Sequence, residues 1–350
     1  MNLPLTLALG ALRSPFKRGP YPDAGRDPFP DGDAVPAARS ARSGPPGSSR
    51  VLRAEVRAEP ARLAAYARLC GWSETGCLPL PYPQVLAFPL TTRLLAARDF
   101  PLPLLGLVHT WIEVDAHRPL LPADRLETTV RVERLAPHRR GTEAVVATEA
   151  RVGGELVWAS RSGYLARHRT GPAVAGRPGP GAVRDTGGTT PAPGTAPATD
   201  PDATPAPAPA PGTDGGEPAK LLPAAEWRLP GDLGRRYGAV SGDRNPIHLY
   251  PLTARAFGFR RPIAHGMWTF ARCLAERDLP RGVRVRAEFR APVMLPATVT
   301  YVTEDAPAGA TGDAGGDGDG TGALGLGAFG LRGDRDRLHL TGRVSPLPYR

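Results

Sequence analysis

An acid and an imidazole lie five residues apart in the run Tyr-Gly-Ala-Val-Ser-Gly-Asp-Arg-Asn-Pro-Ile-His, which spans residues 237–248. Asp243 and His248 are side chains of the kinds that proteins use to move protons near neutral pH. The glycine, asparagine and proline around them favour a loop that can aim both side chains at one point. The pattern predicts a general acid–base site. A plain turn, with Asp243 capping the backbone and His248 packed in the core, is the alternative.

Two parts of the chain have the periodicity of folded structure, and three parts do not. Residues 1–49 are predicted to be a flexible lead-in, and residues 171–219, rich in Pro, Ala and Gly, are predicted to be a linker. A Gly/Ala/Asp-rich stretch at 306–322 is predicted to be a disordered hairpin loop. The remaining residues, 50–170 and 220–350, are each long enough to form a domain.

The second block combines one helical pattern with alternating strands. Apolar residues fall at i, i+3, i+4 and i+7 from Met267, which predicts a helix from Gly266 to about Arg277. Residues 283–290 alternate strictly between apolar and charged side chains, as in a strand with one buried face. Other strands are expected at 226–229, 297–304, 323–332 and 337–344.

The first block has a similar order of elements. A strand is predicted at 51–57, helices at 60–70 and 90–98, and strands at 107–115, 126–135, 143–152 and 155–166. A helix followed by antiparallel strands, occurring twice, predicts an α+β fold in which each sheet wraps a helix. We expect the second copy of the unit to cover the open face of the first sheet.

The composition limits the classes of function. The net charge is +10, but the arginines are scattered and no nucleic-acid motif occurs, so we expect no nucleic-acid partner. Scattered arginines suit either a solvated surface or a phosphate-bearing small molecule. No stretch approaches the ~20 apolar residues of a membrane span. Three cysteines (Cys70, Cys77 and Cys273) without metal-ligand spacing predict a reducing, cytoplasmic setting and no metal site.

Three motifs of the second block resemble those of a known family. Ser-Gly-Asp-x-Asn-Pro-x-His at 241–248 closely resembles the signature of the MaoC-like dehydratases, also called R-specific enoyl-CoA hydratases or the hydratase 2 group. Residues 263–267 resemble that family's second motif, at the start of its central helix, and residues 289–296 resemble the strand that follows. The match covers about 230–300. It implies a hotdog fold, a long helix wrapped by a five- or six-stranded antiparallel sheet, present twice in this chain.

The resemblance also implies that only the second block is catalytic. The first block contains no Asp-x-Asn-Pro-x-His. Its segment most similar to the second motif is 85–90, with Phe88-Pro89 where the second block has Gly266 and Met267. Proline has no amide to donate, and phenylalanine would crowd a reacting carbonyl. We therefore expect the first block to be a catalytically degenerate domain that completes an acyl pocket.

The family reaction is the reversible syn addition of water to a trans-2-enoyl thioester, which gives an (R)-3-hydroxyacyl thioester in fatty acid or polyketide-type metabolism. The resemblance assigns water binding and proton transfer to Asp243 and His248, and leaves open which is the acid and which the base. The backbone amide of Gly266, at a helix N-terminus, would stabilise the thioester oxygen, although a glycine that merely permits tight packing is the alternative. Supporting roles fall to Ser241, Gly242, Asn245 and His265, the last of which could instead be a packed core histidine.

The substrate would bring its own carrier, coenzyme A or the phosphopantetheine of an acyl carrier protein, so no separate cofactor is expected. Candidate phosphate contacts are Arg260, Arg261, Arg284, Arg286 and Arg290, each with a solvent-facing arginine as the alternative. The remaining histidines, namely His109, His117, His138, His168 and His339, are predicted to be structural or exposed. Competing functions are a hotdog acyl-CoA thioesterase and a non-catalytic acyl-thioester-binding subunit. A homodimer is compatible with either.

Overall fold

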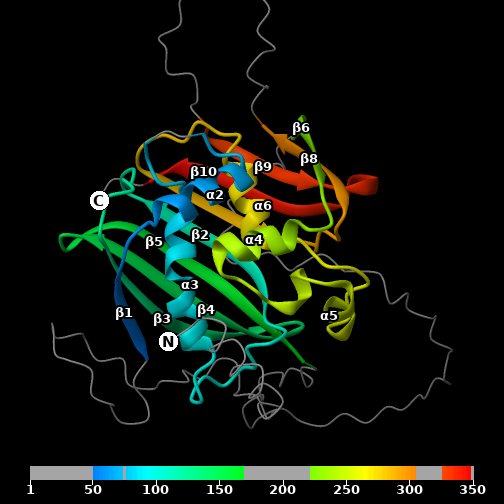
Figure 1. The fold of residues 1–350 in the computed structure, drawn as a ribbon, viewed down its shortest axis with the longest axis horizontal. Coiled ribbons are helices and arrows are strands. Elements are labelled where there is room, and N and C mark those ends of the chain that lie inside the picture. The colour runs from blue at the N-terminus through cyan, green and yellow to red at the C-terminus, as the bar shows by residue number, and fades with distance from the viewer. Residues whose placement is uncertain (1–49, 74–75, 169–220, 305–324, 348–350) are drawn as a thin grey trace, which may run out of the picture.

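The computed structural model describes residues 50–73, 76–168, 221–304 and 325–347. The predicted lead-in, linker and hairpin loop lie outside these residues. The described chain forms one antiparallel sheet with helices packed on it (Figure 1).

Each half contributes five strands to the sheet. The first half supplies β1 (Val51–Val56), β2 (Val108–Ala116), β3 (Leu126–His138), β4 (Gly141–Val152) and β5 (Glu155–Arg167). The second half supplies β6 (Leu222–Leu229), β7 (Val283–Phe289), β8 (Ala297–Thr303), β9 (Gly327–Arg332) and β10 (Leu338–Pro346). Their order is β1-β3-β4-β5-β2-β7-β10-β9-β8-β6. Each half thus adds five adjacent strands to the joint sheet and packs helices against them, which is the predicted double hotdog, and this fold prediction is confirmed.

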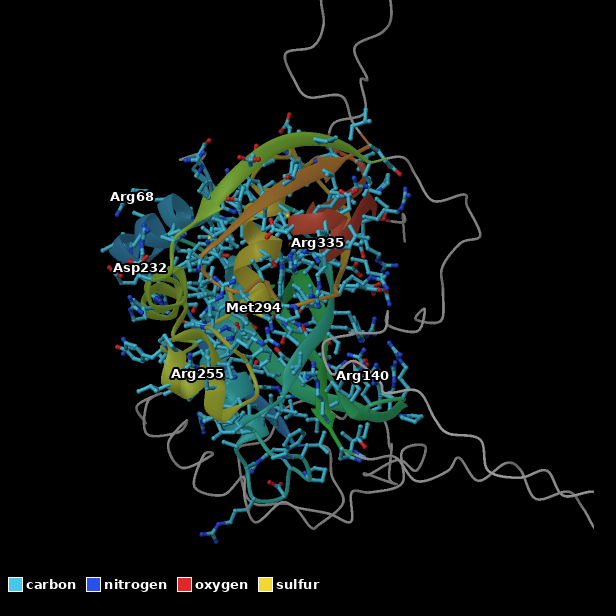
Figure 2. The ribbon with its side chains drawn as sticks, turned by 90° about the vertical axis from the view of Figure 1, so that its right-hand side faces the viewer. Arg68, Arg140, Asp232, Arg255, Met294 and Arg335 are labelled. Carbon is cyan, nitrogen blue, oxygen red and sulfur yellow. The ribbon has the colours of Figure 1, made fainter. Side chains whose placement is uncertain are left out.

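The two halves meet edge to edge. β2 pairs with β7 in an antiparallel register that runs from Trp111 opposite Glu288 to Ala116 opposite Val283. The expectation that one copy covers the open face of the other is therefore wrong. The backbone amides and carbonyls of β2 and β7 therefore find hydrogen-bond partners in the other half. The helices of both halves cover one face of the joint sheet (Figures 1 and 2).

The helices are α2 (Pro60–Cys70), α3 (Tyr82–Leu95), α4 (Leu233–Ser241), α5 (Pro251–Ala256) and α6 (Gly266–Leu274). α2 matches the prediction, and Glu59 caps its first turn by accepting from the amides of Ala61 and Arg62. α3 begins at Tyr82 rather than at residue 90. Eleven of its 14 residues are buried, so its sequence lacks the one-sided apolar pattern that reveals surface helices. None of the helices in the described ranges has the length and apolar character to cross a bilayer.

α6 ends at Leu274, three residues before its predicted end. Arg277 leaves the helix because its buried guanidinium donates to Thr303 Oγ1 at 2.8 Å and to the Gly325 carbonyl at 2.7 Å. The sequence pattern missed α4 and α5, which flank the Asp243–His248 loop. α4 is short and polar, and it buries Leu233, Tyr237 and Ser241 at intervals of four.

One hydrophobic core spans both halves. Tyr66, Tyr82 and Trp158 of the first half share it with Tyr237 and Phe270 of the second. Two indoles tie the halves reciprocally at the edge of this core: the Trp72 Nε1–H donates to the Ala271 carbonyl, and the Trp268 Nε1–H donates to the Leu69 carbonyl, both at 3.1 Å. A shared core of this kind fixes the halves as one body, so side chains from both can line one cavity with defined geometry.

Candidate active site

The loop that carries Asp243 and His248 is tied to itself by short hydrogen bonds. α4 ends in the left-handed conformation at Gly242 (φ 83°), a backbone state that glycine adopts without steric cost. The Asp243 amide donates to Ser241 Oγ at 3.1 Å, and the Ser241 hydroxyl donates to the Tyr237 carbonyl at 2.8 Å. The Asn245 amide donates to Asp243 Oδ1 at 3.1 Å. The loop conformation therefore fixes the carboxylate before any substrate binds.

His248 has one nitrogen available for chemistry. Its Nδ1 lies 2.8 Å from the Ile263 carbonyl oxygen. A carbonyl can only accept, so Nδ1 carries the proton and Nε2 keeps its lone pair. Burial lowers the pKa of His248, although the carboxylate of Asp243 and the Ile263 carbonyl act in the opposite direction. The imidazole is therefore neutral at pH 7 and able to accept a proton.

Asp243 faces the same space. Its side chain is 28% exposed, and it lines the cavity described below rather than the outer surface. Burial raises the pKa of Asp243 above its usual range, against the opposing effects of His248 and of the Asn245 amide. The two groups perturb each other, so they titrate as a pair.

His265 joins this loop to α6. It is buried at the N-cap position, and its Nε2 donates to the Asp243 backbone carbonyl at 3.0 Å. Its ring stacks on that of His248, with centroids 3.6 Å apart. Burial, reinforced by His248, holds the pKa of His265 well below its usual range. Both rings therefore remain neutral. Through its bond to the Asp243 carbonyl and its stacking on His248, His265 holds these two residues in fixed relative positions.

Potential metal ligands also gather here. One ligand atom from each of Asp243, His248 and His265 lies within 4.8 Å of the others. The sequence assigned these three residues to one site but gave no metal motif, because His265 follows His248 by 17 residues, outside the spacing of common metal motifs. Each imidazole already places one nitrogen on a backbone carbonyl, His248 on that of Ile263 and His265 on that of Asp243.

Gly266 is the first residue of α6 and lines the same cavity. Amides in the first turn of a helix have no intrahelical acceptor, and the helix dipole favours negative charge near them. A Cβ atom at Gly266 would lie 3.0 Å from the Phe289 ring. The absence of a side chain at Gly266 therefore serves packing, and the role of its amide as an oxyanion donor stays a prediction.

A single cavity of about 1210 Å³ connects these groups to the first half. Its apolar wall comes from α3 and from the segment after it, through Val85, Phe88, Leu95, Leu104 and Leu107. The predicted alignment of residues 85–90 with the start of the catalytic helix is wrong, because these residues lie inside α3. The first half does not mimic the catalytic motif at this place; it supplies a wall of the site.

The five predicted phosphate-binding arginines separate into two groups. Arg286 and Arg290 line the cavity, whereas Arg260, Arg261 and Arg284 do not. Arg284 makes two 2.7 Å bonds to Asp115 across the β2–β7 junction, and Arg286 pairs with Glu113 at 3.3 Å. Arg261 donates to the Pro296 carbonyl. The polar face of β7 thus mainly joins the two halves. The alternating acids Glu113 and Asp115 of β2 indicate this pairing, and the sequence analysis did not use them.

Sequence reasoning also missed several lining residues. Four histidines predicted to be structural or exposed border the cavity, namely His109, His138, His168 and His339, together with Arg134, Arg139, Arg140, Arg167 and Arg337. His109 lies against the rings of Tyr164 and Phe289, each at 4.8 Å between centroids, and burial lowers its pKa to about 3. No local motif marks these residues, because most of them enter the cavity from strands of the first half, and Arg337 and His339 enter it from the start of β10.

The first half also holds the catalytic loop directly. Arg62 of α2 donates to the carbonyls of Val240 and Ser241, at 2.6 and 2.8 Å, and so caps the last turn of α4. We predict that Arg62→Met lowers kcat several-fold and destabilises the fold by about 2 kcal/mol, since charged hydrogen bonds typically contribute this much. Steady-state kinetics and thermal melts will measure both. Arg68→Met, on the exposed side of the same helix, is the control, and equal effects of the two changes would contradict this positioning role.

Comparison with known proteins agrees with this geometry. Residues 223–307 match the model of the MaoC-like domain. The chain is 35% identical over 253 residues to 3-hydroxyacyl-thioester dehydratase X of Mycobacterium tuberculosis, covering 71% of this chain and 78% of that protein.

Solved structures show the same architecture. The crystal structure of HtdX from Mycobacterium tuberculosis superposes with a TM-score of 0.62 at 30% identity, over 85% of this chain and 100% of that one. A MaoC-like dehydratase from Phytophthora capsici, 18% identical, shares the fold with a TM-score of 0.56 over 86% of this chain and 95% of its own. With its loop, its central helix and its paired hotdog halves accounted for, this chain belongs to the MaoC-like dehydratases.

Proposed function

We propose that this protein catalyses the reversible hydration of trans-2-enoyl thioesters and the dehydration of (R)-3-hydroxyacyl thioesters. The observation that carries the proposal is the convergence of Asp243, His248 and the N-terminus of α6 on one cavity. The name of the Mycobacterium tuberculosis relative supports the same reaction class. A carboxylate, a neutral imidazole and a helix amide are the groups that this reaction requires.

In the hydration direction, Asp243 and the free Nε2 of His248 bind one water molecule between them. The pair removes a proton from this water as its oxygen bonds to the β-carbon of the enoyl group. The pair then returns one proton to the α-carbon from the same side, so the addition is syn and no net proton is consumed. General acid–base catalysis of this kind contributes about 10²–10⁴-fold.

Negative charge builds on the thioester oxygen while the water adds. The Gly266 amide, at the positive end of the α6 dipole, donates to this oxygen and stabilises the charge. His265 and the bonds among Ser241, Asp243 and Asn245 keep the three groups in place. The wall formed by α3 excludes water from the acyl chain, because its lining side chains are largely apolar.

The proposed partners follow from this chemistry. The substrate is an acyl thioester of coenzyme A or of an acyl carrier protein, and proton transfer by Asp243 and His248 requires neither a metal nor a separate cofactor. A cytoplasmic location is proposed because Cys70, Cys77 and Cys273 are all free thiols. A homodimer is also proposed. Because one chain already supplies the cavity lining from both of its halves, we expect the activity per molecule of protein to be independent of protein concentration.

A direct assay tests the reaction. Purified protein is mixed with crotonyl-CoA and longer enoyl-CoAs, and the enoyl absorbance, the hydroxyacyl product and free thiol are followed together. Hydration consumes the enoyl thioester without releasing thiol, whereas a thioesterase releases thiol. Thiol release without hydroxyacyl product, or full hydratase activity in both Asp243→Asn and His248→Ala, would refute the proposal. Crotonyl–acyl carrier protein is included in the panel, since the carrier is a separate variable.

The pH dependence of the rate should reflect the coupled pair. The ordinary pKa values are 3.8 for the carboxyl and 6.5 for the imidazole, and the pKa of Asp243 is raised whereas that of His248 is lowered. The water can lose its proton only to an unprotonated pair, so we predict that kcat/KM falls as the pH drops between about 6.5 and 4. A pH profile of crotonyl-CoA hydration, with thermal melts at each pH as the control, measures this. An acid limb centred above pH 7 would contradict the assignment.

A further inference from the structure

A tyrosine of the first half shares the cavity with the catalytic loop. Tyr164 lies in β5, and it lines the same cavity as Asp243 and His248. Burial, reinforced by the Asp243 carboxylate, raises the pKa of Tyr164 to about 12. The carboxylate is thus close enough for its charge to act on the phenol. Tyr164 remains protonated near neutral pH, so it is a neutral hydrogen-bond donor beside the proposed proton-transfer pair.

The ring of Tyr164 is held by its neighbours in the sheet. His109 lies opposite Tyr164 in the β2–β5 register and stacks on its ring, with centroids 4.8 Å apart and planes 14° apart. His109 also contacts Phe289, whose ring lies 3.0 Å from the position of a Cβ atom at Gly266. A row of rings therefore links Tyr164 to the first residue of α6, and it fixes the tyrosine on the wall that adjoins the reacting groups.

Gln84 of α3 fixes the hydroxyl of Tyr164. α3 packs beside α4, which leads into the catalytic loop (Figure 1). The buried Gln84 Oε1 accepts from Ser160 Oγ at 2.9 Å, which leaves the amide nitrogen of Gln84 to donate elsewhere. Burial and Asp243 raise the pKa of Tyr164, whereas Ser162 and Gln84 act in the opposite direction as hydrogen-bond partners. Donation to the phenol oxygen has this effect, and it leaves the phenol proton for a group in the cavity.

The water molecule of the proposed reaction needs one further donor. A water molecule can donate two hydrogen bonds and accept two. Its two protons face Asp243 and the free Nε2 of His248, and one lone pair attacks the β-carbon. The second lone pair requires a donor. The Nε2 proton of His265 is already used on the Asp243 carbonyl, and the Gly266 amide is assigned to the thioester oxygen.

We infer that the Tyr164 hydroxyl donates a hydrogen bond to the 3-oxygen of the substrate, which is the water oxygen in hydration and the 3-hydroxyl oxygen in dehydration. This inference deepens the proposed hydratase function and rests on it. The bond directs the remaining lone pair of the water at the β-carbon, and in the reverse direction it stabilises the departing oxygen. Tyr164 keeps its proton throughout, so the proton balance of the reaction is unchanged. The half without the acid–imidazole motif thus contributes a catalytic residue.

Tyr164→Phe tests this contribution, because it removes the hydroxyl and keeps the ring on His109. The kcat for crotonyl-CoA hydration should fall roughly 10-fold or more, the effect of one lost hydrogen bond to the reacting oxygen, with little change in KM. The acid limb of the pH profile should stay in place, since Tyr164 does not titrate in that range. A fall in kcat of less than two-fold, or a displaced acid limb, would overturn the inference.

Tyr82→Phe is the matched control. The Tyr82 hydroxyl is buried and has no hydrogen-bond partner in the described part of the chain, and Tyr82 does not line the cavity. This variant removes the same atom from the same half and should leave kcat unchanged. Thermal melts of both variants report any effect on folding. Equal falls in kcat would show that the loss of a phenol hydroxyl acts through the fold, and the inference would be wrong.

Binding without turnover separates this inference from the proposed reaction. Titration calorimetry compares (R)-3-hydroxybutyryl-CoA with butyryl-CoA, which lacks the 3-oxygen. All proteins in this comparison carry Asp243→Asn, so that the hydroxyacyl ligand is not dehydrated. Adding Tyr164→Phe should weaken the binding of the hydroxyacyl ligand about 10-fold and leave that of butyryl-CoA unchanged.

The two ligands are compared within one protein, so a partial loss of folded protein affects both alike. A selective loss of the hydroxyacyl ligand supports the Tyr164 bond even if the parent protein hydrates no thioester. Equal losses for the two ligands, or no loss for either, refute the bond even if hydration proceeds.

Discussion

Asp243→Asn is expected to lower kcat by about 10³-fold while leaving the protein folded and more heat-stable than the parent. The asparagine side chain retains an oxygen that can accept from the Asn245 amide, as Asp243 Oδ1 does at 3.1 Å. It cannot take a proton from water. The activity is lost because the proton acceptor is removed and not because the loop changes shape. Steady-state kinetics of crotonyl-CoA hydration measure the first effect.

The gain in stability follows from the sign of the pKa shift. Burial raises the pKa of Asp243, so the folded state holds the carboxylate less favourably than the unfolded chain does. Removing the charge should therefore raise Tm near pH 7, and this gain should disappear as the pH falls through the raised pKa of the carboxyl. Asp336→Asn, which removes an exposed carboxylate, serves as the control. An Asp243→Asn protein that retains more than a tenth of kcat would show that another group activates the water.

Gly266→Pro should reduce kcat by about 10²–10³-fold, the usual effect of removing one donor to a developing oxyanion. Proline fits the first position of a helix without breaking it, since the amide there has no intrahelical partner. The preceding residue, His265, has φ −66° and ψ 133°, the extended conformation that residues before proline adopt. The substitution therefore deletes the amide hydrogen with little change in the backbone.

Gly266→Ala provides the matched comparison. Alanine and proline both place a Cβ atom about 3.0 Å from the Phe289 ring, but alanine keeps the amide. The ratio of kcat between the alanine and proline variants isolates the contribution of the hydrogen bond, and thermal melts of both report any effect on packing. If the two variants have the same kcat, Gly266 is important only for packing, and the oxyanion donor must be sought elsewhere.

Features whose interacting groups are close along the chain could be predicted from the sequence, and features whose groups are far apart could not. The 241–248 loop could be predicted because its hydrogen bonds run between neighbours such as Ser241, Asp243 and Asn245. α2 could be predicted because Glu59 and Pro60 mark its start. α3 could not be delimited, since burial on nearly all sides removes the periodic contrast on which helix prediction depends.

The parts of the site that could not be predicted come from contacts between the halves. Arg62 reaches Val240 across 178 positions of the chain. The arginines of β7 appeared suited to phosphate, but their function depends on Glu113 and Asp115, which lie opposite them only after the two sheets join. Pairing partners of this kind cannot be assigned from residue types alone.

The β2–β7 junction also determines which edges can pair. In its antiparallel register, Glu113 lies opposite Arg286 and Asp115 opposite Arg284. At these two positions the acids come from β2 and the guanidinium groups come from β7, which also carries Glu288. If β2 paired with a copy of itself, its acids would lose these guanidinium partners, which disfavours that pairing. The junction therefore favours pairing between the two different edges. The two halves also need not be identical, as the subunits of a symmetric dimer are. One half can therefore supply the proposed proton-transfer residues while the other supplies a wall of the cavity.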